Sequence, residues 1–264
     1  QTDAKVTETE ATKAAEVSAL DIVSPEDRAR MPIFETMMKV GVMYGRKKSK
    51  TDPKMQSYLY AVRNGICIFD IVKTLECLNR AKDAIRMIAK QGGKMLLVGT
   101  QPAAADLVQN FAREHGQYYI TSRWLGGTLT NFKTIGSRVE RFRKLKADRA
   151  EGKLEQYTKK ERLLLDREIE KMTLLFSGIE EMRTMPQAVL LINTEVHETA
   201  LREARRMKVP IVALMNSDTN PELVNYPIPG NSNARPSIMW VLNELSGAFK
   251  EGASMMPKPE PPKV

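Results

Sequence analysis

The chain has 264 residues, of which 42% are hydrophobic, and it carries a formal net charge of +9. Its length and composition allow a sizeable core in one large domain, or in a domain with an insertion. No apolar run approaches the ~20 residues that a membrane-spanning helix needs, so we expect no membrane partner.

The N-terminal segment is acidic and the rest of the chain is basic. Residues 1–30 contain seven acids and four bases, so they carry −3 and the remainder carries +12. Such a polar, charged segment predicts a disordered tail over 1–30. A basic body predicts a polyanionic partner, with a solvated lysine-rich surface as the alternative.

A basic stretch, GRKKSKTDPKM, covers residues 45–55. Its glycine, serine, aspartate and proline predict a loop, and a loop cannot bury this much charge. It can lay its cations along a phosphate backbone. The candidate RNA-binding residues of this stretch are Arg46, Lys47, Lys48, Lys50 and Lys54.

The first half of the chain alternates apolar runs with helical patterns. Residues 65–71 (GICIFDI) predict a buried strand, followed by a long helix that ends at 91–93 (QGG). Residues 94–99 predict the next strand. A helix then begins at Pro102, and 117–121 predict a third strand.

The same alternation returns in the second half. Residues 188–193 and 209–215 predict strands on either side of a helix over 195–208. An extended piece over 226–229 precedes a last helix over 236–250. Continuous apolar strands separated by helices are typical of a parallel sheet covered on both faces.

A different pattern separates the two halves. Residues 133–171 hold 13 bases and eight acids, and apolar residues recur there at a 4-3-4-3 spacing. This spacing predicts a coiled-coil seam. The seam residues are Leu165, Ile169, Met172, Phe176 and Ile179, with Ile135, Val139 and Phe142 on an earlier arm. Residues 150–158 supply the break between the two arms.

These patterns predict an α/β fold, a Rossmann-like (flavodoxin-like) parallel sheet in a three-layer α/β/α sandwich. The sandwich is expected over 31–134 and 185–250, with a coiled-coil helical hairpin inserted at 135–184. The proline-rich residues 251–264 predict an extended C-terminal tail.

Enzyme signatures are weak. The two histidines, His115 and His197, belong to no metal or catalytic motif, and Cys67 and Cys77 lie among apolar residues as reduced core cysteines. We therefore predict no enzyme, no catalytic residue, no metal and no cofactor. The strand-to-helix turn before Pro102 supports a rival hypothesis, a Rossmann-like enzyme that binds a nucleotide or sugar phosphate. A third possibility is a coiled-coil adaptor.

The stretch RWLGGTLTNF, residues 123–132, places a cation, a tryptophan, two glycines and several hydroxyl or amide groups before a basic helix. Its glycines allow positive φ and leave backbone N–H groups open to a phosphate. We interpret Trp124 as mostly structural, although its ring can also stack on a base. The candidate RNA-binding residues here are Arg123, Trp124, Asn131, Lys133 and Arg138.

Several longer motifs resemble the bacterial-type ribosomal protein S-two family of the small ribosomal subunit. They occur in the family order between residues 34 and 250. They are DPKM (52–55), RNGICIFDIVKT (63–74), GGKMLLVGT (92–100), RWLGGTLTNFKTI (123–135), YTKKERLLLDREIEK (157–171) and YPIPGNSNARPSI (226–238). The second motif adds Arg63 to the candidate RNA-binding residues.

The resemblance implies a structural, RNA-binding component of the small subunit, without a small-molecule substrate. Family members are expected on the solvent side near the head–body junction, among neighbouring ribosomal proteins. They help to anchor the large mRNA-binding protein S-one. We expect a bacterial cytoplasmic ribosome, with a mitochondrial or plastid ribosome as the alternative.

The sequence departs from the family pattern at a few positions. Met43 and Arg46 stand where histidines are common, and Thr51 replaces a tryptophan. Asn193 and Asn225 stand where aspartate is usual. These changes weaken any metal or stacking role that the resemblance would attach to these positions.

Overall fold

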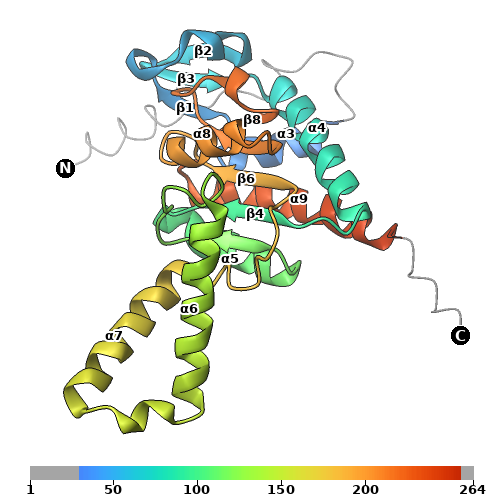
Figure 1. Ribbon diagram of the computed structural model, residues 1–264. Coiled ribbons are helices and arrows are strands. Elements are labelled where there is room, and N and C mark those ends of the chain that lie inside the picture. Colours follow the sequence, from blue (N-terminus) through green and yellow to red (C-terminus); the bar gives the residue numbers. More distant parts are fainter. Residues whose placement is uncertain (1–29, 257–264) are drawn as a thin grey trace, which may run out of the picture.

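A five-stranded parallel sheet forms the centre of the computed structural model, which describes residues 30–256 (Figure 1). Its strands lie in the spatial order β5-β4-β6-β7-β8. Counted along the chain, this is the flavodoxin-like order 2-1-3-4-5. The predicted fold class is therefore confirmed. The strands are β4 (Met95–Val98), β5 (Tyr118–Ile120), β6 (Ala188–Ile192), β7 (Ile211–Met215) and β8 (Tyr226–Pro229).

Helices cover both faces of this sheet, because successive strand residues point to opposite faces. Met95 and Leu97 of β4 belong to one apolar cluster, and Leu96 and Val98 belong to another. The first cluster includes residues of α4 (Ile71–Lys90), α5 (Pro102–Glu114) and α9 (Arg235–Ser254). The second includes residues of α8 (Glu198–Arg206) and of the start of α6 (Phe132–Ala150).

A separate three-stranded antiparallel sheet follows α3 (Met31–Lys39), in the order β1-β3-β2. The predicted strand at 65–71 is present as β3 (Ile66–Phe69) but lies here, outside the parallel sheet. The reason is the Asn64–Gly65 turn, whose φ values of 49° and 75° suit a two-residue hairpin. That turn pairs β3 directly with β2 (Leu59–Arg63).

The predicted loop over 45–55 is also partly regular. It contains most of β1 (Tyr44–Lys47), the 3₁₀ turn η2 (Lys48–Lys50) and the start of η3 (Pro53–Tyr58). Pairing with β3, which is distant in sequence, converts the basic segment into a strand.

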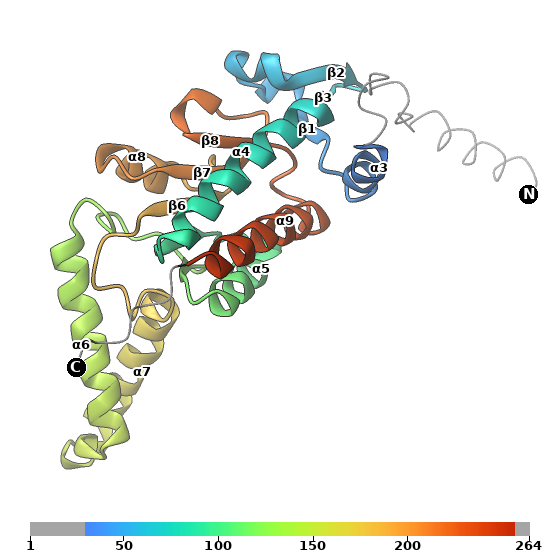
Figure 2. The ribbon, with the colours of Figure 1, turned by 90° about the vertical axis from the view of Figure 1, so that its right-hand side faces the viewer.

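Two helices project from the sandwich between β5 and β6 (Figures 1 and 2). They are α6 and α7 (Lys159–Phe176), joined through η4 (Lys153–Gln156) at the predicted break. The rings of Phe142 and Phe176 lie 6.4 Å apart, centroid to centroid, and both are buried. At 1.5 Å per residue each helix is about 28 Å long. The winding of the two helices as a coiled coil stays a prediction.

The helix α9 continues to Ser254, past the expected start of the C-terminal tail at 251. The rest of that tail from 257, and the predicted N-terminal tail up to 29, lie outside the described residues. No helix within 30–256 is both long and apolar enough to cross a bilayer.

Candidate nucleic-acid interface

The predicted RNA-binding residues fall into two separate groups in the fold. One group lies on or beside the small sheet, at one end of the molecule (Figure 1). The other lies on the loop after β5 and on α6, near the base of the projecting helices. The sequence alone does not show whether these residues form one continuous patch. The fold places them in two groups.

The small sheet brings two distant cations together. Lys47 on β1 and Arg63 on β2 both pair with Ile66 on the central strand β3. Directly opposed residues of an antiparallel sheet point to the same face, with Cβ atoms about 4.5–5.5 Å apart. All three residues are exposed. The sheet thus presents one cation on each side of an exposed isoleucine.

Lys48 and Lys50 extend this row from η2, which is held to the hairpin by a 2.9 Å hydrogen bond from the Lys48 N–H to the Gly65 carbonyl. Within residues 30–256, the side chains of Lys47, Lys48, Lys50 and Arg63 make no hydrogen bond or ion pair. We call these four residues the sheet-tip cations. Their charge is not neutralised by the described part of the chain.

Arg46 lies in a strand and pairs with two carboxylates of the protein, which corrects its predicted place in a loop. Its Nε donates to the Asp218 carboxylate at 3.0 Å, and its Nη2 lies 3.4 Å from Glu195. Burial, with the neighbouring Glu195 carboxylate, raises the pKa of Asp218, and Arg46 partly opposes that rise. Because Arg46 compensates these two carboxylates, we leave it out of the interface.

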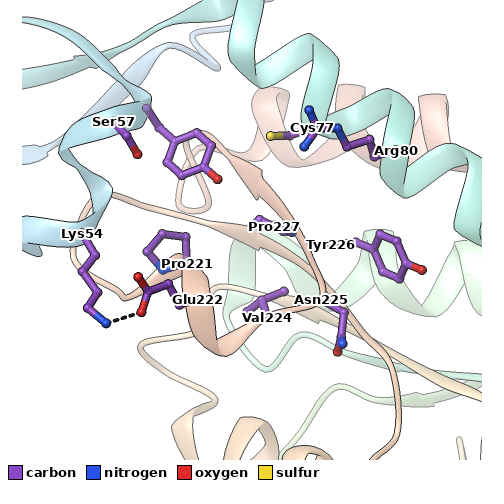
Figure 3. A pocket seen from close by; sticks show the side chains of 11 residues that line it. Lys54, Ser57, Cys77, Arg80, Pro221, Glu222, Val224, Asn225, Tyr226 and Pro227 are labelled. Carbon is purple, nitrogen blue, oxygen red and sulfur yellow. Dashed lines mark hydrogen bonds and ion pairs between the residues drawn. The ribbon is translucent and has the colours of Figure 1, made fainter.

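Lys54 is also compensated. Its ammonium pairs with the Glu222 carboxylate at the rim of a cavity of about 390 Å³ (Figure 3). Cys77 lines the same cavity from α4, and burial raises the pKa of its thiol. A thiol that stays protonated is a poor nucleophile, so the cavity offers no activated cysteine.

The loop that leads into α6 is organised by a buried carboxylate on α8. One oxygen of Glu203 accepts from Trp124 Nε1 at 3.0 Å and from the Gly127 N–H at 2.8 Å. The other accepts from the N–H groups of Leu129 at 3.0 Å and Thr130 at 3.2 Å, and from the Thr130 hydroxyl at 3.1 Å. A concave set of backbone donors that suits an anion is thus filled by the protein's own side chain.

Electrostatics agree with this arrangement. Burial alone raises the pKa of Glu203, but the hydrogen bonds from Trp124 and from the loop N–H groups outweigh it, and the pKa is lowered. Gly127 has a φ of 91°, as predicted for a loop that turns its N–H groups inward. The expected phosphate contact of those N–H groups is wrong, because Glu203 occupies them.

The outer side of the same loop and helix carries free charge. Arg123, Lys133 and Arg138 are exposed, and their side chains make no hydrogen bond or ion pair with the described residues. We call them the loop–helix cations. Asn131 precedes the first residue of α6, is exposed, and accepts from the Thr134 hydroxyl at 2.8 Å. Trp124 is half-buried and held by Glu203, which supports its structural interpretation.

A buried histidine lies at the point where the rival enzyme would bind its ligand. In flavodoxin-like sheets, ligands bind beyond the strand ends where the order reverses, here between β4 and β6. His197 fills this point: its Nδ1–H donates to the Asn193 carbonyl at 2.8 Å, and its Nε2 accepts from the Thr100 N–H at 3.1 Å. Gly99 permits tight packing, since a Cβ there would lie 2.8 Å from Val108.

The comparison with known families shows which family this chain belongs to. The model of the family "Ribosomal protein S2" matches residues 37–252 of the chain. This chain belongs to the ribosomal protein S2 family. The members of this family are structural components of ribosomes. The motifs around the sheet-tip and loop–helix cations lie inside the matched region.

Individual members of the S2 family align over most of the chain. The small ribosomal subunit protein uS2 of Paramagnetospirillum magneticum is 40% identical over 84% of this chain and 84% of its own length. The uS2 protein of Bdellovibrio bacteriovorus is 39% identical over 83% of this chain and 70% of its own. The uS2c protein of Cyanophora paradoxa is 38% identical over 83% and 94%.

The surroundings of two residues of this S2-family chain could not be predicted from the sequence. Glu203 falls on the same helical face as the buried Ala200 and Ala204, and a charge on an apolar face is a signal of a bound partner. Arg143 follows the buried Val139 by one turn of α6 and is itself half-buried. Neither residue has a partner nearby in the sequence, so their environments were not visible.

Proposed function

We propose that this chain is a non-catalytic structural component of the small ribosomal subunit that binds rRNA through phosphate contacts. Membership of the S2 family supports the ribosomal role. The sheet-tip cations and the loop–helix cations are the proposed contact residues. Arg46 and Lys54, which pair with carboxylates, are not among them.

One observation carries the proposal. Exposed lysines and arginines usually have acids nearby on the same surface, as Arg141 has Glu168 at 3.0 Å. The sheet-tip cations form no ion pair with the described residues, and β-pairing holds Lys47 and Arg63 in one row. Neutralising phosphates releases their counterions, which favours binding.

The test is the salt dependence of binding to small subunits that lack this protein. We expect the triple variant Lys47→Gln, Lys48→Gln, Lys50→Gln to bind more weakly at every salt concentration. The slope of log K against log salt should become shallower by about three, because each lost phosphate contact removes roughly 0.9. Sedimentation of the bound protein measures both quantities.

The matched control removes three cations elsewhere: Lys39→Gln, Lys90→Gln and Lys250→Gln, on α3, α4 and α9. This variant has the same net charge but keeps the sheet tip, so its slope should stay close to that of the wild type. Equal slopes for both triple variants would mean that total charge, and not the sheet tip, determines binding.

The resemblance to the family also leads us to propose a position on the solvent side near the head–body junction, where the chain supports anchoring of the S-one protein. A density map of subunits carrying the chain tests this position. The bacterial and uS2c relatives fit the expected bacterial ribosome, with a plastid ribosome as the alternative.

A further inference from the structure

Arg143 on α6 is a cation with nothing to bind inside the described chain. Two of its three guanidinium nitrogens, Nε and Nη2, are buried and have no hydrogen-bond partner within residues 30–256. The guanidinium is a planar cation that offers hydrogen-bond donors and no acceptor. Buried N–H donors without an acceptor destabilise a fold, which makes them an unusual feature to retain.

The two orphan nitrogens point to the kind of partner that is missing. Nε–H and Nη2–H lie on the same edge of the planar guanidinium and run parallel. This edge makes the two-bond fork with one oxyanion, a carboxylate or a phosphate.

A cavity of about 290 Å³ opens beside this guanidinium. Arg183, which follows α7, adds a second cation, is exposed and has no ion pair within the described chain. Glu140 is the one acid among the lining residues, and it forms no ion pair with either arginine. The other lining residues are Phe132, Gly136, Val139 and Met182.

We propose that this cavity is a phosphate site, in which the Arg143 fork and Arg183 hold one phosphate group. A backbone phosphate of rRNA and free inorganic phosphate offer the same oxygens. Binding of an rRNA phosphate rests on the proposed function, whereas binding of free inorganic phosphate does not. Glu140 and Arg183, which also line the cavity, are both exposed to solvent.

The first experiment uses the full chain alone and inorganic phosphate as the probe. Thermal melting is recorded with increasing phosphate and with sodium chloride of equal ionic strength. The variants are Arg143→Met, which removes the fork, and Arg143→Lys, which keeps the charge without the fork. The control, Arg167→Met, removes an exposed arginine of α7 that has no described ion pair.

We expect phosphate to raise the Tm of the wild type and of Arg167→Met in a saturable way, and not that of Arg143→Met. Arg143→Lys should lose most of the response. In phosphate-free buffer Arg143→Met should be as stable as the wild type or more so, because it removes two buried N–H donors that have no acceptor. An equal phosphate response in the wild type and Arg143→Met overturns the site. The site is also overturned by three results together. The Tm of the wild type does not respond to phosphate, Arg143→Met is less stable than the wild type in phosphate-free buffer, and Arg143→Met leaves the slope of log K against log salt in the second experiment unchanged.

The second experiment distinguishes the two sources by binding to small subunits that lack the protein. If the ligand is an rRNA phosphate, Arg143→Met makes the slope of log K against log salt shallower by about one relative to Arg167→Met. An unchanged slope with a phosphate-dependent Tm assigns the site to free phosphate. Failure of the wild type to bind subunits would refute the proposed function and leave the melting experiment as an independent test.

Discussion

At the residue scale, Glu203 joins α8 to the loop that starts α6. Replacing it by alanine leaves Trp124 Nε1 and three backbone N–H groups without an acceptor. We expect Glu203→Ala to lower the free energy of unfolding by about 3 kcal/mol or more, because buried donors are then unsatisfied. Urea unfolding measures the loss, and faster amide exchange at Gly127 and Leu129 locates it.

The control for this prediction is Glu198→Ala on the same helix. Glu198 pairs with Arg202 on the surface, and both side chains are largely exposed. Such pairs contribute less than about 1 kcal/mol. If the two variants lose the same stability, the loop is not held by Glu203.

The same contact has a defined pH dependence. The folded-state pKa of Glu203 is lowered, because the loop hydrogen bonds outweigh its burial. Its contribution is therefore complete above the ordinary glutamate pKa of about 4.3 and is lost as the pH falls below it. The Glu203→Ala variant should lack this part of the acid sensitivity.

At the scale of elements, His197 connects the end of β4 to the segment between β6 and α8. Burial lowers the pKa of His197, against the opposing effect of its backbone hydrogen bonds. As the pH falls, His197 therefore binds a proton more readily in the unfolded chain than in the folded chain. Stability should be complete above about pH 6.5 and fall towards pH 5, by at most about 1.4 kcal/mol per pH unit for one histidine.

The measurement is urea unfolding of the wild type and of His197→Gln at pH 7, 6 and 5. We expect a smaller decrease for the variant than for the wild type. His115, whose pKa is also lowered by burial between Phe111 and Phe249, supplies the remaining decrease. Parallel decreases in the two proteins would mean that His197 does not take up the proton.

The projecting helices divide into two parts with different packing. Near the sheet, Val139, Phe142 and Phe176 are buried in the second apolar cluster. Further out, the arms are joined by ion pairs such as Arg149 with Asp166 at 3.3 Å. The outer part can therefore be removed without exposing the core, whereas the inner part cannot.

This difference gives a test of an adaptor role. We expect replacement of residues 147–162 by a short Gly–Ser turn to leave binding to small subunits intact, because the sheet-tip and loop–helix cations remain. If the arms anchor the S-one protein, subunits carrying the variant should retain less of it in a sucrose gradient. Undiminished S-one would contradict a role of the outer arms in anchoring.

At the scale of the whole molecule, the described cations are either paired or unpaired. Some form ion pairs within the protein, such as Arg46 with Asp218 and Lys82 with Glu244. Others remain free in two separate places, on the small sheet and around the start of α6 (Figure 1). A rigid sandwich between them fixes the distance between two proposed RNA contacts.

Much of the parallel sheet could be predicted from the sequence. The runs at 94–99, 188–193 and 209–215 are long apolar segments between amphipathic helices, and each is a strand of the sheet. The small sheet was harder to predict. β1 is short and charged, and its strand character arises from pairing with β3, which periodicity does not show.

The sequence by itself determined the fold class, the family motifs and the excess of positive charge, because these depend on composition and on patterns a few residues long. The tertiary structure decided which charges are free. Arg46 meets Asp218 across 172 positions, and Glu203 meets the Trp124 loop across more than 70. Whether a charged side chain is compensated depends on neighbours that only folding brings within a few ångströms.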